Sequence, residues 1–191
     1  MRCLPVIAAL VLAAPALASA QAAPPAQPAN TVTATQDHAF DWIFGTWKAT
    51  LRRLDRPLTG STKWIEFEGM QYSKKVWGGR ASLDEFVVNS PSTNTVIEGV
   101  TLRLYDPKAQ QWRIYWANAK RGIVDPPVVG RFTDGRGEFY GQDELDGRVI
   151  LVRYIWSDIT STSAHFEQSF SADGGKTWEP NWISDVTRVK D

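Results

Sequence analysis

The sequence predicts an all-β protein: an antiparallel up-and-down barrel of about 8–10 strands, preceded by a short helical turn. From residue 47 onward, short runs rich in β-branched and aromatic residues recur at intervals of roughly 8–12 residues, divided by Gly, Asp, Asn and Pro. No segment of about twelve residues or more repeats apolar side chains at helical spacing. The dividing turns are short, which favours pairing between sequence neighbours and a sheet that closes on itself without exposed edges.

The first residues have the pattern of a removable export signal. Arg2 precedes an apolar run from Leu4 to Leu17, and the small residues Ala18, Ser19 and Ala20 follow. This order is typical of a secretory signal peptide, here residues 1–20. The run contains two prolines and is shorter than the about 20 apolar residues of a membrane span, so no transmembrane segment is expected after cleavage. We expect an exported protein, periplasmic or secreted.

Charge and cysteine content exclude several kinds of partner. Cys3 is the only cysteine and lies within the predicted signal, so the mature chain has no disulfide and no thiolate metal site. The chain has 21 basic and 21 acidic residues, and loss of Arg2 leaves 20 against 21. Without a basic patch, nucleic acid is not an expected partner.

The remaining chain divides into a spacer and one domain. Residues 21–36 are uncharged and rich in Ala, Pro, Gln and Thr, which is typical of a disordered tether. Residues 37–191 are expected to form a single β-barrel domain, with a helical turn at 40–44. All nine Trp, eight Phe and five Tyr fall within that domain. An aromatic core or an aromatic-lined cavity follows from this density.

Alternation of side chains gives each strand an expected inner face. Trp47, Ala49 and Leu51 share one face of the first strand. In the central hairpin we expect Leu102 and Leu104 to face the interior, together with Ile114 and Trp116 of the next strand. The expected strands are residues 47–54, 61–70, 72–77, 81–88, 96–105, 111–118, 128–132, 138–145, 148–156, 164–170 and 181–189.

Gly45-Thr46-Trp47, after the aromatic helical turn, resembles the start of the calycin barrels, the lipocalins and their relatives. The resemblance implies that Trp47 packs at the closed end of a barrel, with an arginine from the last strand over its ring. Arg188 is that arginine, so Gly45, Trp47 and Arg188 are the expected closure residues. A guanidinium over an indole contributes about 0.5–2 kcal/mol. A plain β-sandwich is the alternative fold.

A second resemblance covers nearly the whole domain, from Phe40 to Arg188. The segments that carry it are FDWIFGTW, GVTLRLYDP, WRIYWA, DPPVVGRF, YGQDELDGR, WSDIT and SADGGKTWE. They are similar to a family of secreted bacterial proteins of unknown function. The resemblance supports the barrel and implies no activity.

The segment 171–178 resembles the Asp-box turn of β-propeller sialidases. In that turn an aspartate accepts backbone hydrogen bonds and a tryptophan packs beneath it. The single copy here cannot build a propeller, so a structural turn is expected. Its residues are Ser171, Asp173, Gly175, Thr177 and Trp178.

If Trp47 points inward, strand parity selects candidate ligand-binding residues. They combine aromatic rings with a few polar tips, as expected of a small-molecule cavity for an apolar or amphipathic ligand. A filled interior is the alternative, because a small barrel can also close over its own side chains. The candidates are Trp116, Tyr154, Trp156, Phe166, Gln168, Trp182 and Ser184.

No catalytic residue, metal site or cofactor is assigned. The only histidines are His38 and His165, and no acidic or histidine cluster has zinc-like spacing. Haem is an alternative only if His165 points into the barrel. Because His165 alternates with Phe166, parity predicts that it faces solvent.

Two further classes of function remain open. A hydrolase or isomerase would use Glu66 or Asp143 together with Arg103, Arg131 or Arg153, and paired carboxylates would also suit a glycosidase. A structural envelope domain with a filled core is the third class. Carboxylates desolvated inside a cavity would favour an enzyme.

Overall fold

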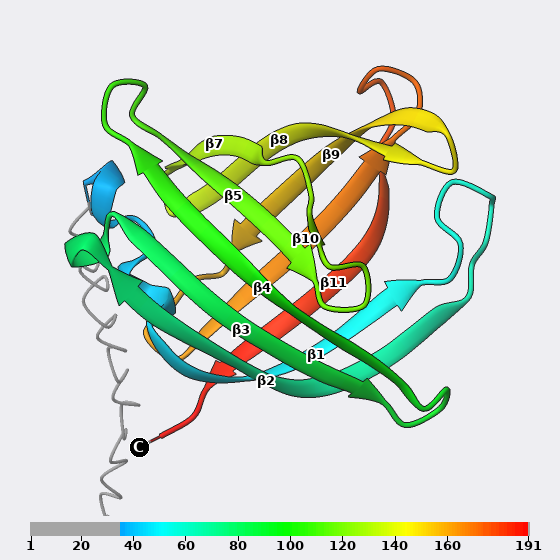
Figure 1. Cartoon of the computed structure of the whole chain (residues 1–191), viewed down its shortest axis with the longest axis horizontal. Helices are drawn as coiled ribbons and strands as arrows, with labels where there is room; N and C mark the ends of the chain where they lie inside the picture. Colours follow the sequence, from blue (N-terminus) through cyan, green and yellow to red (C-terminus); the bar gives the residue numbers. More distant parts are fainter. Residues whose placement is uncertain (1–34, 191) are drawn as a thin grey trace, which may run out of the picture. The chain divides into compact units, whose positions relative to one another are not determined.

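Antiparallel strands close into a barrel in the computed structural model, which describes residues 35–190 (Figure 1). Three short 3₁₀ helices accompany them, η1 (Gln36–His38), η2 (Asp41–Ile43) and η3 (Trp77–Gly79). The strands are β1 (Gly45–Leu54), β2 (Trp64–Val76), β3 (Ala81–Ser90), β4 (Thr95–Asp106), β5 (Gln111–Asn118), β6 (Ile123–Val124), β7 (Val128–Thr133), β8 (Arg136–Leu145), β9 (Arg148–Ser157), β10 (Ser163–Ser171) and β11 (Glu179–Arg188).

Ten of these strands form the closed wall. β1 pairs with β11, where Trp47 lies opposite Arg188, and β4 pairs with β5 to complete the circle. The two-residue strand β6 pairs with β5 alone. In Figure 1 the wall of β2 to β5 lies in front, and β9 to β11 cross behind it. The predicted antiparallel barrel with a short N-terminal helical turn is therefore confirmed.

Two strand predictions were wrong. Residues 61–70 and 72–77 were expected as separate strands, but 64–76 form one continuous strand, β2. Gln71 keeps the alternation across the expected break, because it is buried between exposed or half-buried neighbours. The short strand β6 was not expected; two residues are too few to show a period.

The inner face of β4 was also predicted wrongly. Leu102 points outward and is 36% exposed, and Leu104 shares its face. The residues of the opposite parity, Thr101 and Arg103, line the interior. The outer face of this wall is itself apolar, with Leu83 38% exposed on the neighbouring strand, so hydrophobic alternation did not identify the buried side.

Aromatic side chains close one end of the barrel. Phe40, between η1 and η2, is fully buried and meets the rings of Trp112 and Phe132 edge-on at centroid distances of 5.0 and 4.9 Å. Trp47 is also fully buried, and its Nε1 donates a hydrogen bond to the carbonyl oxygen of Ile43 at 2.6 Å. The helical turn thus plugs this end of the barrel.

Two residues assigned to the tether, Thr35 and Gln36, are among the described residues. Gln36 accepts a hydrogen bond from Trp112 Nε1 at 2.6 Å, and its side chain bonds both backbone groups of Phe132. Gln36 thus bonds to β5 and β7 one residue before the expected domain start at residue 37. The predicted signal peptide, residues 1–20, lies outside the described residues. Within residues 35–190, no helix has the length and apolar character needed to cross a membrane.

Candidate functional site

A cavity of about 100 Å³ lies inside the barrel, and we refer to it as the inner cavity. Seven strands contribute to its lining, so side chains far apart in sequence converge on one space. All seven candidate ligand-binding residues line it: Trp116, Tyr154, Trp156, Phe166, Gln168, Trp182 and Ser184. The other lining residues are Gln71, Phe86, Thr101, Arg103, Ile114 and Val186.

The lining is mainly aromatic. Trp156 and Phe166 lie 4.7 Å apart between ring centroids, and Tyr154 meets Phe166 edge-on at 5.2 Å. Across the cavity Phe86 lies 6.0 Å from Trp116 and 6.1 Å from Trp182. Edge-on rings present both faces and edges to a ligand, an arrangement that suits a flat apolar body.

A buried polar cluster on β2, β3 and β4 borders the cavity on the side of the aromatic plug. Arg103 and Asp84 form an ion pair and are 3% and 1% exposed. Arg103 Nη1 also donates to Ser82 Oγ at 3.3 Å, and Gln71 Nε2 donates to Asp84 Oδ2 at 3.1 Å. Burial raises the pKa of Asp84, and the Arg103 guanidinium opposes that shift. Because the Arg103 guanidinium also lies 5.0 Å from the Phe40 ring, the cluster joins the plug to the cavity.

Two buried atoms of this cluster lack partners among the described residues. They are Arg103 Nε and Asp84 Oδ1. Buried polar atoms are nearly always satisfied by protein, water or ligand. The cluster therefore has hydrogen-bonding capacity to spare, and Arg103 brings it to the cavity wall.

Tyr154 lies where the inner cavity meets a second chamber. Burial, followed by the nearby carboxylates of Asp125 and Asp143, raises the pKa of Tyr154 well above its usual value. The phenol therefore stays protonated. A neutral hydroxyl can both donate and accept a hydrogen bond at this junction.

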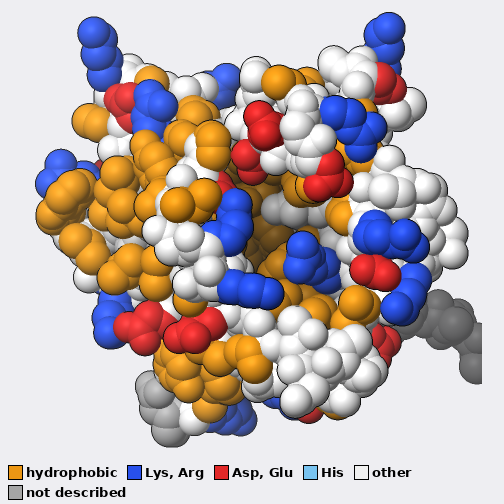
Figure 2. All heavy atoms as spheres, turned by 45° about the vertical axis from the view of Figure 1, so that its right-hand side comes forward, with side chains coloured by type: hydrophobic (Ala, Val, Ile, Leu, Met, Phe, Trp, Pro, Cys, Tyr) orange, Lys and Arg blue, Asp and Glu red, His pale blue; other side chains and the backbone are white. Residues whose placement is uncertain are grey.

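The second chamber, which we refer to as the outer chamber, has a volume of about 330 Å³. It shares Trp116, Tyr154, Gln168 and Trp182 with the inner cavity. Figure 2 shows a hollow with hydrophobic side chains at its base and charged side chains around it. Charged residues that line the outer chamber are Arg53, Arg121, Asp125, Asp143 and Glu144.

Comparisons with known proteins bear on the fold alone. The chain is similar to solved β-barrels. The S-type phycobiliprotein lyase CPES from Guillardia theta matches with a TM-score of 0.54 and 13% identity, over 80% of this chain and 91% of that chain. Rv2717c from M. tuberculosis matches with a TM-score of 0.54 and 12% identity, over 80% of this chain and 98% of that chain. No family model matches the sequence, and no curated protein does.

The barrel is closed by the residues that the first motif singled out. The Arg188 guanidinium carbon lies 4.2 Å from the centroid of the Trp47 ring. Arg188 also donates to the carbonyl oxygens of Phe44 at 2.7 Å and Ser161 at 2.7 Å. Gly45 lies against it, since a Cβ there would be 2.9 Å from Arg188 Nη1. These residues hold the plug to the last strand and lie outside the lining of the inner cavity.

The turn between β10 and β11 contains the five Asp-box residues. Asp173 accepts backbone hydrogen bonds from Lys176 at 3.0 Å and Thr177 at 3.0 Å, and a third from the Thr177 hydroxyl at 2.7 Å. Ser171 donates to Asp173 at 2.7 Å and accepts from the amide of Gly175. The Trp178 ring packs beneath the guanidinium of a β9 arginine. All of these contacts hold the turn.

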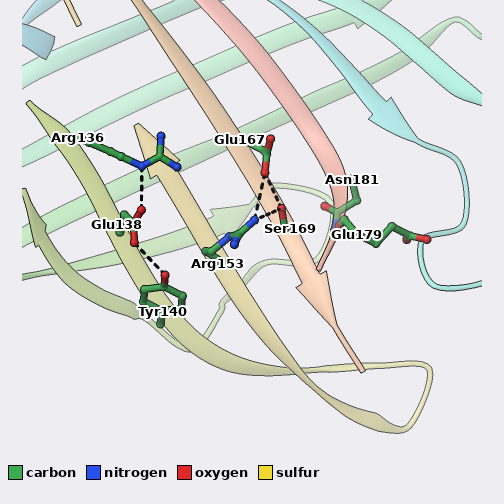
Figure 3. A network of polar contacts seen from close by, with 8 residues as sticks. All are labelled: Arg136, Glu138, Tyr140, Arg153, Glu167, Ser169, Glu179 and Asn181. Atoms are coloured by element: carbon green, nitrogen blue, oxygen red, sulfur yellow. Dashed lines mark hydrogen bonds and ion pairs between the residues drawn. The ribbon is translucent and has the colours of Figure 1, made fainter. Parts of the chain in front are cut away.

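Acidic side chains also gather on the outer face of β8 to β10 (Figure 3). Glu138 accepts hydrogen bonds from Arg136 at 2.8 Å and from the Tyr140 hydroxyl at 3.0 Å, which lower its pKa. Arg153 lies 3.5 Å from Glu167 in an ion pair. Glu138 and Glu167 are each engaged by an arginine on the outside of the wall, so these pairs do not contribute to the inner cavity.

The groups expected for a catalytic alternative are not brought together. Glu66 and Arg131 are exposed on the outer face, and Asp143 reaches only the outer chamber. Arg103 does point inward, but its partner is Asp84, a residue that sequence reasoning missed. Alternation with Phe86 was the available signal for its inward position.

His165 lies on the outer face, as strand parity indicated. Its Nδ1 is 2.7 Å from Asp185 Oδ1, and it does not line the inner cavity. Within residues 35–190, no three His, Cys, Asp or Glu side chains are grouped so as to hold a metal ion. The lining of the inner cavity supplies hydrogen-bonding groups and aromatic surface.

Proposed function

We propose that this protein binds an amphipathic small molecule inside the barrel. The observation that carries the proposal is the meeting of seven aromatic and polar side chains from β5, β9, β10 and β11 around one cavity. Sites of this kind are concave, mostly apolar and equipped with a few oriented polar groups. The apolar body of the ligand would lie against Trp116, Trp156 and Trp182.

The size of the space supports a ligand with a compact inner part. An apolar cavity of about 150 Å³ holds one benzene ring in an engineered protein. The inner cavity is of that order, at about 100 Å³. A longer ligand would pass Tyr154 and extend into the outer chamber, where the lining carries charges of both signs.

Binding of an uncharged fluorescent probe tests this function. N-phenylnaphthylamine, whose emission rises in apolar surroundings, should bind the wild type. Trp182→Ala and Trp116→Ala should each weaken its binding at least about tenfold, because each removes a ring from the contact surface. Titration of probe emission measures the affinity, and circular dichroism checks the fold.

Trp77→Ala is the matched control, because it also removes an indole. Trp77 is 64% exposed on η3 and does not line either chamber. Its removal should leave probe affinity unchanged. A wild type that binds neither this probe nor a single-ring compound small enough for the inner cavity would contradict the proposal and favour a structural domain.

We further propose that the protein acts outside the cytoplasm. The support is the pattern of residues 1–20: a basic start, an apolar centre and small residues at 18–20. A chain without cysteine after that segment is suited to an oxidising compartment, because no free thiol can be oxidised or mispaired there.

A further inference from the structure

Arg103 is the only charged side chain in the lining of the inner cavity, as far as residues 35–190 are concerned. A guanidinium stays protonated at any working pH. At 3% exposure it cannot rely on water to stabilise its charge. What compensates this charge decides which polar groups the cavity accepts.

The compensating group is already part of the protein. Asp84, 1% exposed, pairs with Arg103 through Oδ2, and Gln71 donates to the same oxygen at 3.1 Å. Asp84 is absent from the cavity lining, so it stands behind Arg103 as seen from a ligand. The buried pair is therefore close to neutral overall.

Arg103 still has a donor to offer. Its Nε is buried without a hydrogen-bond partner among the described residues. Gln71 also lines the cavity and uses its side-chain nitrogen toward Ser73 and Asp84. Both hydrogen bonds that Arg103 makes, to Ser82 and Asp84, use Nη1, so an acceptor that reaches another nitrogen of the guanidinium would gain a hydrogen bond without displacing an existing one.

We propose that the inner cavity selects ligands whose inner end is an uncharged hydrogen-bond acceptor, such as an amide, ketone or ester carbonyl, and discriminates against carboxylates. This inference rests on the proposed function and specifies the ligand class of the same cavity. A carboxylate would bring a second negative charge beside one buried cation and would lose its hydration. A carbonyl would accept from Arg103 and lose far less solvation.

Three single-ring compounds of similar shape test the selection on the wild type: benzamide, benzoate and ethylbenzene. Titrations are followed by the indole N–H signals of the tryptophans in NMR spectra. Benzamide should bind at least about tenfold more tightly than benzoate. It should also bind more tightly than ethylbenzene, which has no acceptor. Benzoate binding as tightly as benzamide, or more tightly, would overturn the inference.

Asp84→Asn removes the negative charge of the Arg103–Asp84 pair and keeps nearly the same side-chain shape. Arg103 then lacks its counter-ion, and a bound carboxylate can replace it. The ratio of benzoate to benzamide affinity should rise at least about tenfold over the wild type. An unchanged ratio in a folded variant would contradict the role given to Asp84.

Glu85→Gln is the matched control. It removes the same charge one residue along β3, but Glu85 is exposed on the outer face and pairs with Lys74 at 3.3 Å. The affinity ratio should stay at the wild-type value. If Asp84→Asn does not fold, the wild-type series alone decides, because it requires no variant.

The two proposals fail in different ways. If N-phenylnaphthylamine and all three single-ring compounds leave the wild type unaffected, the proposed binding function is wrong. If the fluorescent probe binds but benzoate matches benzamide, the cavity binds ligands and only the selection against carboxylates is wrong.

Discussion

Gly45 lies where the backbone and the closure arginine leave no room for a side chain. Its φ is +113°, a conformation that residues with a Cβ rarely adopt. A Cβ would lie 2.9 Å from Arg188 Nη1, which donates to the carbonyl oxygen of Phe44. Both the backbone and the neighbouring side chain therefore require glycine at this residue.

Gly45→Ala should lower the free energy of unfolding by about 2–4 kcal/mol, through backbone strain and displacement of Arg188. Urea unfolding measures the change. Gly60→Ala is the control, because Gly60 also has a positive φ, +77°, but nothing lies within 4 Å of its Cβ position. It should cost only the conformational part, about 1 kcal/mol. Equal losses in the two variants would show that the Arg188 contact contributes nothing.

At the residue scale, the aromatic lining could be predicted and the polar cluster could not. Trp182 and Phe166 lie on strands whose outer faces are polar, so their inward position follows from alternation. Arg103 and Asp84 lie on strands that are apolar on the outside as well, with Leu83 and Leu102 more than a third exposed. On β4 the hydrophobic pattern favours the wrong face, and on β3 only the alternation with Phe86 indicates the inner position of Asp84. Pairing of two buried charges depends on register between strands, which composition does not reveal.

The turn between β10 and β11 is held by one carboxylate. Asp173 accepts from two amides and two hydroxyls, and the amide and hydroxyl of Thr177 are the main cause of its lowered pKa. The pKa lies well below the usual value of 3.8. As the pH falls, the unfolded chain takes up its proton before the folded one does. The stabilisation is therefore complete at neutral pH. It is lost progressively as the pH falls below the unfolded-state pKa of 3.8.

Asp173→Asn should lower the unfolding temperature by a few degrees at about pH 7, because the amide nitrogen cannot accept the Thr177 hydroxyl. At about pH 3 the difference from the wild type should shrink, since the wild-type aspartate begins to lose the same advantage. Thermal unfolding by circular dichroism at both pH values measures this.

Asp134→Asn is the matched variant for this comparison. Asp134 lies in the turn between β7 and β8 and accepts no hydrogen bond from a described residue. Its change should have little effect at either pH. A difference for Asp173→Asn that stayed constant with pH would contradict the charge-dependent account.

Strands with clear turn residues at both ends were predictable as elements. β5 was predicted with its observed bounds, and Asp146-Gly147 located the β8–β9 turn. β2 was not predicted as one strand. The residues near its middle resemble the end of one strand and the start of another, although the alternation of buried and exposed side chains continues through Gln71. Local composition locates turns well when they contain Gly or Asp with positive φ, and poorly when a strand is simply long.

At the scale of the whole molecule, closure of the sheet could be predicted from one contact. A sandwich would have separated Trp47 from Arg188, whereas a barrel brings the first and last long strands together. The cavity volume could not be predicted, because it depends on how the rings of all strands pack against one another.

The expected fate of the whole chain is export with removal of residues 1–20. Expressed with its leader in a Gram-negative host, the protein should be recovered from the periplasm with a mass that begins at Gln21. Mass spectrometry of the fraction measures it. Replacing Ala18 and Ala20 with Phe should block cleavage, because the small residues at that site are what the peptidase accepts. Recovery of the full 191-residue chain from the cytoplasm would contradict export.

β11 is the last strand of the barrel to be synthesised, and it lies between β1 and β10. Until it emerges, both of those strands have an unpaired edge, which is a site for association with other chains. Closure of the wall must therefore wait until β11 has been synthesised. If the chain is exported as proposed, this order keeps the barrel from closing early and obstructing its own passage.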